Sequence, residues 1–197
     1  MTRAALLVSF VAILASTVGS AAQTASPYAG QEQRSIKALS DQEIRDLREG
    51  RGMGLAKAAE LNSYPGPLHV LQLADQLGLS DSQRAVTESL YAEMRNKVLP
   101  IGQKIIEAEK NLDQDFVNGR IDPSSLQTQV NAIAILQGEL RAAHLETHLA
   151  QRSLLTLEQT SHYNTVRGYG DRAPHGNNRH GGYAPSGDEQ DRPGARR

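Results

Sequence analysis

The feature that most constrains this fold is a pair of long apolar stripes joined by a very short connection. In the first stripe, large apolar or alanine side chains recur every three or four positions: Val86, Leu90, Met94, Val98, Ile101, Ile105, Ala108, Leu112 and Phe116. The second stripe has the same spacing: Leu126, Val130, Ile133, Leu136 and Leu140. Steps of three and four keep one face of an α-helix apolar along its length. The two stripes therefore predict two long amphipathic helices.

The connection between the stripes predicts how these helices are arranged. Asn118-Gly119 is typical of a helix end, and Asp122-Pro123 is typical of a helix N-cap followed by the first helical position. Because only a few residues join the two helices, they have to run antiparallel. A hairpin of this length cannot cover both of its apolar faces. We therefore predict an all-α fold, with a long antiparallel helical hairpin, shorter flanking helices and a homodimer.

Composition agrees with helices packed on helices. The chain has no Cys and no Trp, and Phe116 is the only Phe after residue 22. A core of Leu, Ile, Val, Ala and Met suits helical packing better than a β-sandwich. The absence of Cys also excludes disulfides and thiolate metal sites.

The two ends of the chain differ from its middle. Residues 1–22 are typical of a secretory signal peptide, with Arg3, an apolar run over residues 4–15, and small residues before Gln23. The run is shorter than the roughly 20 residues of a membrane span, so we expect cleavage, with an uncleaved anchor as the alternative. Residues 171–197 lack Val, Ile, Leu, Met and Phe, which predicts a disordered tail. Between them we expect an N-terminal extension with short helices at 23–64 and a helical domain at 65–170.

Several segments carry the capping-box pattern, in which a Ser or Thr is followed three residues later by Glu or Gln. Three of them begin at Ser40, Ser80 and Thr156, and Ser-x-x-Glu/Gln also occurs elsewhere in the chain. The second and third bracket the hairpin, and we expect each to start a helix.

No residue pattern indicates catalysis. Gly50, Gly52 and Gly54 have the spacing of a nucleotide-binding loop, but no predicted strand precedes them. No Ser-His-Asp arrangement is recognisable with any specificity. The formal net charge of −1 does not indicate a nucleic-acid partner. We expect a protein that is not an enzyme and binds no nucleic acid.

A pair of histidines is the best functional indication in the chain. His144 and His148 continue the second stripe in steps of four, so both imidazoles lie on one helical face and can share one cation. The alternative is a pair of packed interfacial histidines. Folding the hairpin about residue 120 brings His148 near Glu93 and Met94, and Met94 is interpreted as a core residue. A different stagger would bring Glu88 instead.

A further histidine precedes the hairpin. His69 lies in the first turn of the helix that Pro67 begins, where the helix dipole favours the neutral, metal-binding form of imidazole. Taken alone, His69 is more readily interpreted as a capping or packing residue than as a metal ligand.

The motif residues resemble a known family. Leu155-Thr156-Leu157-Glu158-Gln159 resembles the LTxxQ motif of the Spy/CpxP family of periplasmic proteins, and Leu79-Ser80-Asp81-Ser82-Gln83 is similar to its first copy, with Ser in place of Thr. The resemblance covers residues 65–170. It implies a periplasmic, elongated helical protein, commonly a dimer with a concave cradle. Members include ATP-independent chaperones, stress-signalling adaptors and heavy-metal sensors or resistance proteins.

The histidine pair before LTxxQ is similar to the metal-sensing branch of that family. There, such a pair joins a histidine from an earlier helix and a carboxylate. The resemblance implies a heavy-metal sensor or resistance protein in which His144, His148 and His69 bind a divalent transition metal (Zn, Ni, Co or Cu). The carboxylate is Glu93, with Glu88 as the alternative. The alternative is a periplasmic chaperone or envelope-stress adaptor, whose partners are unfolded clients or a membrane signalling protein.

Overall fold

The computed structural model describes residues 26–170, and both the predicted signal peptide, 1–22, and the predicted disordered tail, 171–197, lie outside them. The chain divides into two compact units after Gln33. The described part of the first unit contains a short 3-10 helix, Gln31–Gln33. All of the α-helices of the described residues belong to the second unit.

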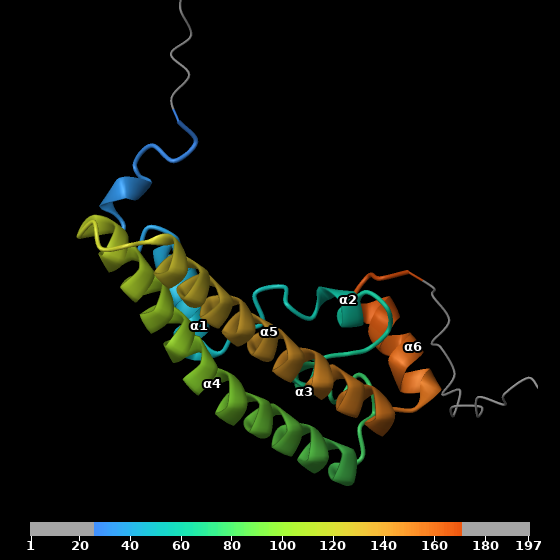
Figure 1. The fold of residues 1–197 in the computed structure, drawn as a ribbon. Helices are drawn as coiled ribbons and strands as arrows, with labels where there is room; N and C mark the ends of the chain where they lie inside the picture. Colours follow the sequence, from blue (N-terminus) through green and yellow to red (C-terminus); the bar gives the residue numbers. More distant parts are fainter. Residues whose placement is uncertain (1–25, 171–197) are drawn as a thin grey trace, which may run out of the picture. The chain divides into compact units, whose positions relative to one another are not determined.

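The second unit is built around a helical hairpin. Its helices are α1 (Asp41–Glu49), α2 (Lys57–Glu60), α3 (Pro67–Gln72), α4 (Asp81–Val117), α5 (Pro123–Leu154) and α6 (Leu157–Val166). The two long helices, α4 and α5, pack side by side (Figure 1). Apart from one isolated bridge between Ile36 and Leu39, residues 26–170 contain no β-structure. The predicted all-α fold, a long antiparallel hairpin with shorter flanking helices, is confirmed.

Capping boxes start four of the helices, α1, α4, α5 and α6, and three of them begin at the predicted Ser40, Ser80 and Thr156. The Ser80 hydroxyl accepts from the Gln83 N–H at 3.2 Å, and Gln83 Oε1 accepts from the Ser80 N–H at 3.1 Å. Thr156 and Gln159 make the same two contacts, each at 3.0 Å, at the start of α6. Ser40 begins α1 with a third complete box. These contacts satisfy backbone donors that a helix N-terminus leaves unpaired.

The main core lies between the hairpin and the segment that contains α1. It consists of Ile36, Leu39, Ile44, Leu47, Met94, Val98, Ile105, Ile106, Leu140 and Ala143. The approach of α1 to α4 depends on Gly102, because a Cβ atom there would lie 2.4 Å from the Leu47 carbonyl oxygen. The division between an extension at 23–64 and a domain at 65–170 stays a prediction, although side chains from both ranges share this core.

A smaller core joins the other end of the hairpin to α3 and α6. Val70, Leu77, Leu155 and Tyr163 are buried together there. Some positions of the predicted stripes are not covered: Phe116 is 56% exposed and Val130 44% exposed. The two long helices therefore keep an apolar surface near the hairpin turn. Within residues 26–170, no helix combines the length and the hydropathy needed to cross a membrane.

Candidate functional site

A cavity of about 760 Å³ lies beside the hairpin, and loop 50–54, α2, the start of α3, and both long helices contribute to its wall. Its apolar wall includes Met53, Leu61, Leu68, Tyr91 and Met94. The loop is held to α4 by Arg95, whose guanidinium donates to the Glu49 carbonyl at 2.8 Å. A volume of this size is typical of a small-ligand site.

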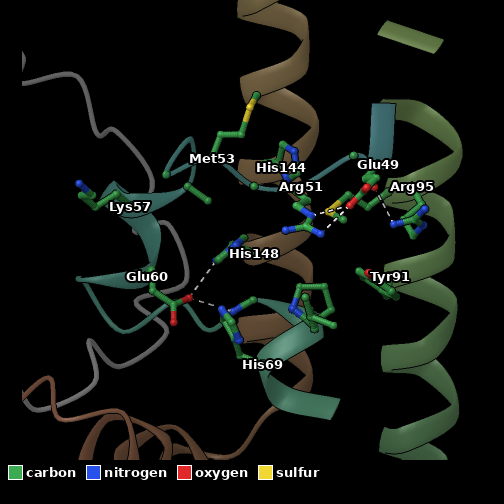
Figure 2. Close-up of a pocket in the computed structure, with 18 of the residues that line it drawn as sticks. Glu49, Arg51, Met53, Lys57, Glu60, His69, Tyr91, Arg95, His144 and His148 are labelled. Atoms are coloured by element: carbon green, nitrogen blue, oxygen red, sulfur yellow. Dashed lines mark hydrogen bonds and ion pairs between the residues drawn. The ribbon is translucent and has the colours of Figure 1, made fainter. Parts of the chain in front are cut away.

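The three histidines singled out from the sequence all line this cavity (Figure 2). His69 comes from α3, while His144 and His148 come from successive turns of α5. Met94 lines the same cavity and is a buried core residue, which confirms its interpretation as core. The structure therefore brings residues distant in the sequence to one place.

His144 is a neutral, buried imidazole. It is 3% exposed, and its Nε2 atom has no hydrogen-bond partner among residues 26–170. Burial lowers the pKa of His144, and the nearby His148 lowers it further. The neutral form is the one that donates a lone pair to a metal ion.

The orientation of His148 is set by backbone contacts. Its Nδ1 lies 2.7 Å from the carbonyl oxygen of Tyr64. Because a carbonyl only accepts, Nδ1 carries the proton and Nε2 keeps its lone pair. Gly66 makes this position possible, since a Cβ atom there would lie 2.7 Å from His148 Cε1 and 2.8 Å from Nε2. Metal-binding histidines commonly have such a second hydrogen bond.

His69 has a comparable partner on its own helix. Its Nδ1 lies 3.0 Å from the side-chain oxygen of Gln72. Since that oxygen accepts, Nδ1 carries the proton in this arrangement and Nε2 is free to accept or to bind a cation.

The structure does not bring Glu93 to the histidines. Its side chain is exposed and accepts from the Ser89 hydroxyl at 2.9 Å, one turn earlier on α4. Glu93 directly precedes Met94, and neighbouring residues of a helix point about 100° apart. When Met94 points to the core, Glu93 therefore points to solvent. Glu88 is exposed as well.

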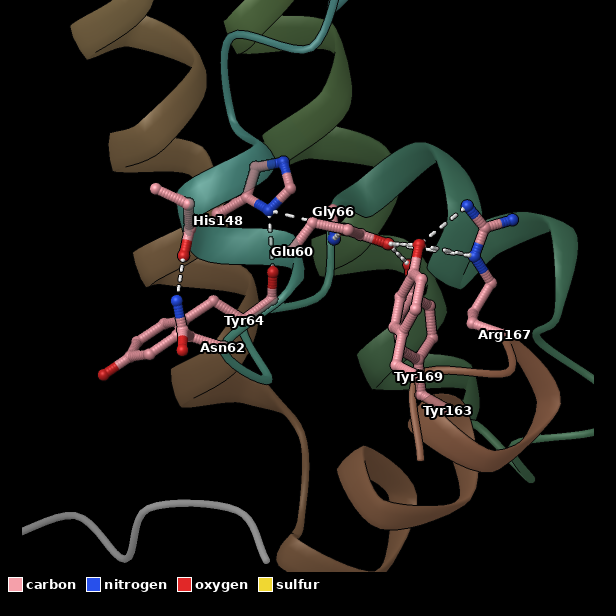
Figure 3. Close-up of polar contacts among 9 residues, drawn as sticks. Glu60, Asn62, Tyr64, Gly66, His148, Tyr163, Arg167 and Tyr169 are labelled. Atoms are coloured by element: carbon pink, nitrogen blue, oxygen red, sulfur yellow. Dashed lines mark hydrogen bonds and ion pairs between the residues drawn. The ribbon is translucent and has the colours of Figure 1, made fainter. Parts of the chain in front are cut away.

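Glu60, which sequence reasoning missed, is the carboxylate beside the histidines. Its Oε2 lies 3.7 Å from His148 Nδ1 and accepts from the Gly66 N–H at 3.2 Å (Figure 3). Its side chain is only 14% exposed. No periodicity distinguishes Glu60 from other carboxylates, because it is the last residue of the four-residue helix α2, which is too short to show a pattern.

These groups have the donor chemistry for a transition metal, with imidazole lone pairs and one carboxylate. Within residues 26–170, however, no three His, Asp or Glu side chains are close enough to hold one ion. Binding that uses more than two of them therefore requires the side chains to move together.

Comparison with known proteins identified no relative of this chain. No protein-family model matches the chain, and no curated protein or solved structure matches it with significance. The resemblance to the Spy/CpxP family stays a prediction that rests on the motif residues.

Proposed function

We propose that this protein is a periplasmic metal-binding sensor or heavy-metal resistance protein of the Spy/CpxP type. A divalent transition metal such as Zn, Ni, Co or Cu binds through His144, His148 and His69, and Glu60 takes the role first considered for Glu93. The observation that carries the proposal is that all three histidines, from α3 and α5, line one cavity.

The state of the imidazoles supports this proposal. A buried polar atom without a partner costs roughly 1–3 kcal/mol, and within the described part of the chain His144 Nε2 is such an atom. A metal ion that binds Nε2 removes this cost. His148 and His69 have hydrogen bonds at Nδ1, so their Nε2 atoms are available without loss of those bonds.

A sensor also requires that the metal changes the conformation. Zinc–nitrogen bonds are about 2.0–2.1 Å long, and the described side chains do not form a closed set of three ligands. Ligation therefore favours a conformer in which α2, α3 and α5 lie closer together. The metal shifts the equilibrium by its higher affinity for that conformer.

Calorimetry on the untagged mature protein tests the proposal, with Zn, Ni, Co and Cu titrated separately. We expect at least one metal to bind tighter than about 100 μM, or roughly 5.5 kcal/mol. The double variant His144→Ala, His148→Ala should lose this binding. His162→Ala is the matched control, since His162 is exposed on α6 outside the cavity. Equal binding by the double variant, or none by the wild type, contradicts the proposal.

A second candidate, an ATP-independent chaperone or stress adaptor, is favoured by the uncovered apolar side chains of the hairpin. Phe116, Val117, Leu126, Val130, Ile135 and Leu149 are all more than a third exposed. Such side chains offer a surface to unfolded clients. Light scattering from an aggregating model enzyme tests this. Wild-type protein should suppress the scattering, and the pair Val130→Ser, Ile135→Ser should suppress it less than the control Thr128→Ser.

A further inference from the structure

Glu60 connects the cavity to the C-terminal end of the described chain. Its Oε1 accepts hydrogen bonds from the hydroxyls of Tyr163 and Tyr169, the latter at 3.0 Å, and lies 3.8 Å from Arg167 Nε (Figure 3). On its other side, Oε2 contacts the Gly66 N–H and faces His148. One carboxylate thus lies between the histidine cavity and the end of α6.

The donors to Oε1 are firmly placed. Tyr163 is fully buried, and its ring packs near that of Tyr169, with the ring centroids 6.5 Å apart. Arg167 donates to the Tyr169 hydroxyl at 3.1 Å, which holds this group in the same network. Burial raises the pKa of Tyr163, and the contact with Glu60 raises it further, so the hydroxyl remains a donor over the physiological range.

We propose that the C-terminal segment 163–169 and a cation in the cavity compete for the Glu60 carboxylate. This segment then acts as a built-in antagonist of metal binding, and metal binding releases it. The inference rests on the proposed function, because it assigns the regulation of that same site.

The competition follows from the number of lone pairs on one carboxylate. Each oxygen of Glu60 already accepts at least one hydrogen bond, and Oε1 accepts two. Both lone pairs of Oε1 are in use, so a metal ion that takes Oε1 displaces a tyrosine hydroxyl. Oε2 accepts one hydrogen bond, from the Gly66 N–H, and keeps a second lone pair on the side of His148. On either oxygen, the metal ion withdraws negative charge from the Glu60 carboxylate. This weakens the hydrogen bonds that the hydroxyls of Tyr163 and Tyr169 donate to it. Linkage is reciprocal: if metal binding weakens the contact of the segment with Glu60 by some factor, that contact weakens metal binding by the same factor.

Tyr169→Phe and Tyr163→Phe test this on the full mature chain, since each removes one hydroxyl and keeps the ring. Each variant removes one hydrogen bond from the segment to the Glu60 carboxylate, so the segment competes less strongly with zinc. We expect zinc binding to become about tenfold tighter. Tyr64→Phe is the matched control. The contact of Tyr64 with His148 is through its backbone carbonyl, so zinc affinity should not change.

Hydrogen exchange provides a readout that does not depend on affinity. Zinc should speed amide exchange over residues 163–169 of the wild type. Glu60→Gln should speed it without any metal, because the neutral amide holds the tyrosine hydroxyls more weakly. Circular dichroism checks that every variant stays helical.

The outcomes separate the two proposals. If the wild type binds zinc through His144 and His148, but both tyrosine variants bind it equally well and exchange at 163–169 does not rise, the competition is overturned and the sensor proposal stands. If only the tyrosine variants bind zinc, the competition is supported and the wild-type sensor is not. If neither wild type nor variants bind zinc, both proposals fail.

Discussion

The side-chain amides of Gln83 and Gln159 hydrogen-bond to each other in both directions, at 2.9 and 3.0 Å. Each amide also donates to a backbone carbonyl next to the other motif. Gln83 Nε2 donates to Leu154, and Gln159 Nε2 donates to Gly78. Since each Oε1 also accepts from its own N-cap, both amides use all of their hydrogen-bonding groups. The two capping boxes thus lock the starts of α4 and α6 together.

This pairing predicts strong coupling between the two glutamines. Gln83→Ala and Gln159→Ala should each destabilise the fold by about 1–2 kcal/mol, through loss of a cap contact and of the amide pair. The double variant should cost less than the sum, with a coupling of about 0.5–3 kcal/mol. Urea unfolding of the four proteins measures the cycle, and Gln76→Ala, at an exposed position, is the control. Additive losses would show that the amides act independently.

Gly66 is predicted to be required for the position of His148. In Gly66→Ala the new Cβ atom would lie within 2.8 Å of the imidazole, and the ring would have to leave the Tyr64 carbonyl. We expect a loss of about 1–3 kcal/mol of stability and weaker metal binding. Gly138→Ala is the matched control on α5, where a Cβ atom meets nothing within 4 Å. That change should stabilise the protein by about 0.5–1 kcal/mol. Equal effects of the two changes would contradict this role.

Because the His144 imidazole is buried, we expect the folded protein to lose stability in mild acid. Burial lowers its pKa in the folded protein below the ordinary histidine value of about 6.5. Between these two pKa values the unfolded chain binds a proton that the folded protein does not. Stability should therefore fall as the pH drops through about 6.5, and continue to fall until the lowered pKa is reached. Urea unfolding between pH 8 and pH 4 measures this, and His144→Met should flatten the profile. His162→Gln should leave the profile unchanged, and a slope kept in His144→Met would assign it to another group.

The predicted homodimer can now be tested at exposed positions. Ile105 is unsuitable because it is 2% exposed in the core of the single chain, whereas Ile135 is 62% exposed on α5. Ile135→Asp should convert a dimer into a monomer in sedimentation at micromolar concentration. The change should alter the stability of the monomer by no more than about 0.5 kcal/mol, as for other surface substitutions. Gln137→Asp is the control, and a wild-type monomer would contradict the prediction.

Export predicts a defined mature N-terminus. If residues 1–22 are a cleaved signal peptide, intact-mass analysis of exported protein should give a chain that begins at Gln23. A mass that still includes residues 1–22 would support the alternative of an uncleaved anchor.

Local patterns were sufficient for the helices. Steps of three and four residues report directly which face of a helix is apolar. A capping box contains all of its own partners within four residues. The hairpin, the boxes at Ser40, Ser80 and Thr156, and the shared face of His144 and His148 were therefore predictable, because each depends on neighbours along the chain.

Contacts between distant segments were not predictable in this way. Glu60 rather than Glu93 lies beside His148, Gly66 and Gly102 allow close approaches, and Gln83 pairs with Gln159. These relationships depend on how α1, α2, α3 and α6 pack on the hairpin. Successive side chains of a helix point about 100° apart. A small change in how the helices pack therefore decides which carboxylate faces the histidines. Periodicity along one helix carries no information about such distances, and they are set only when the helices pack.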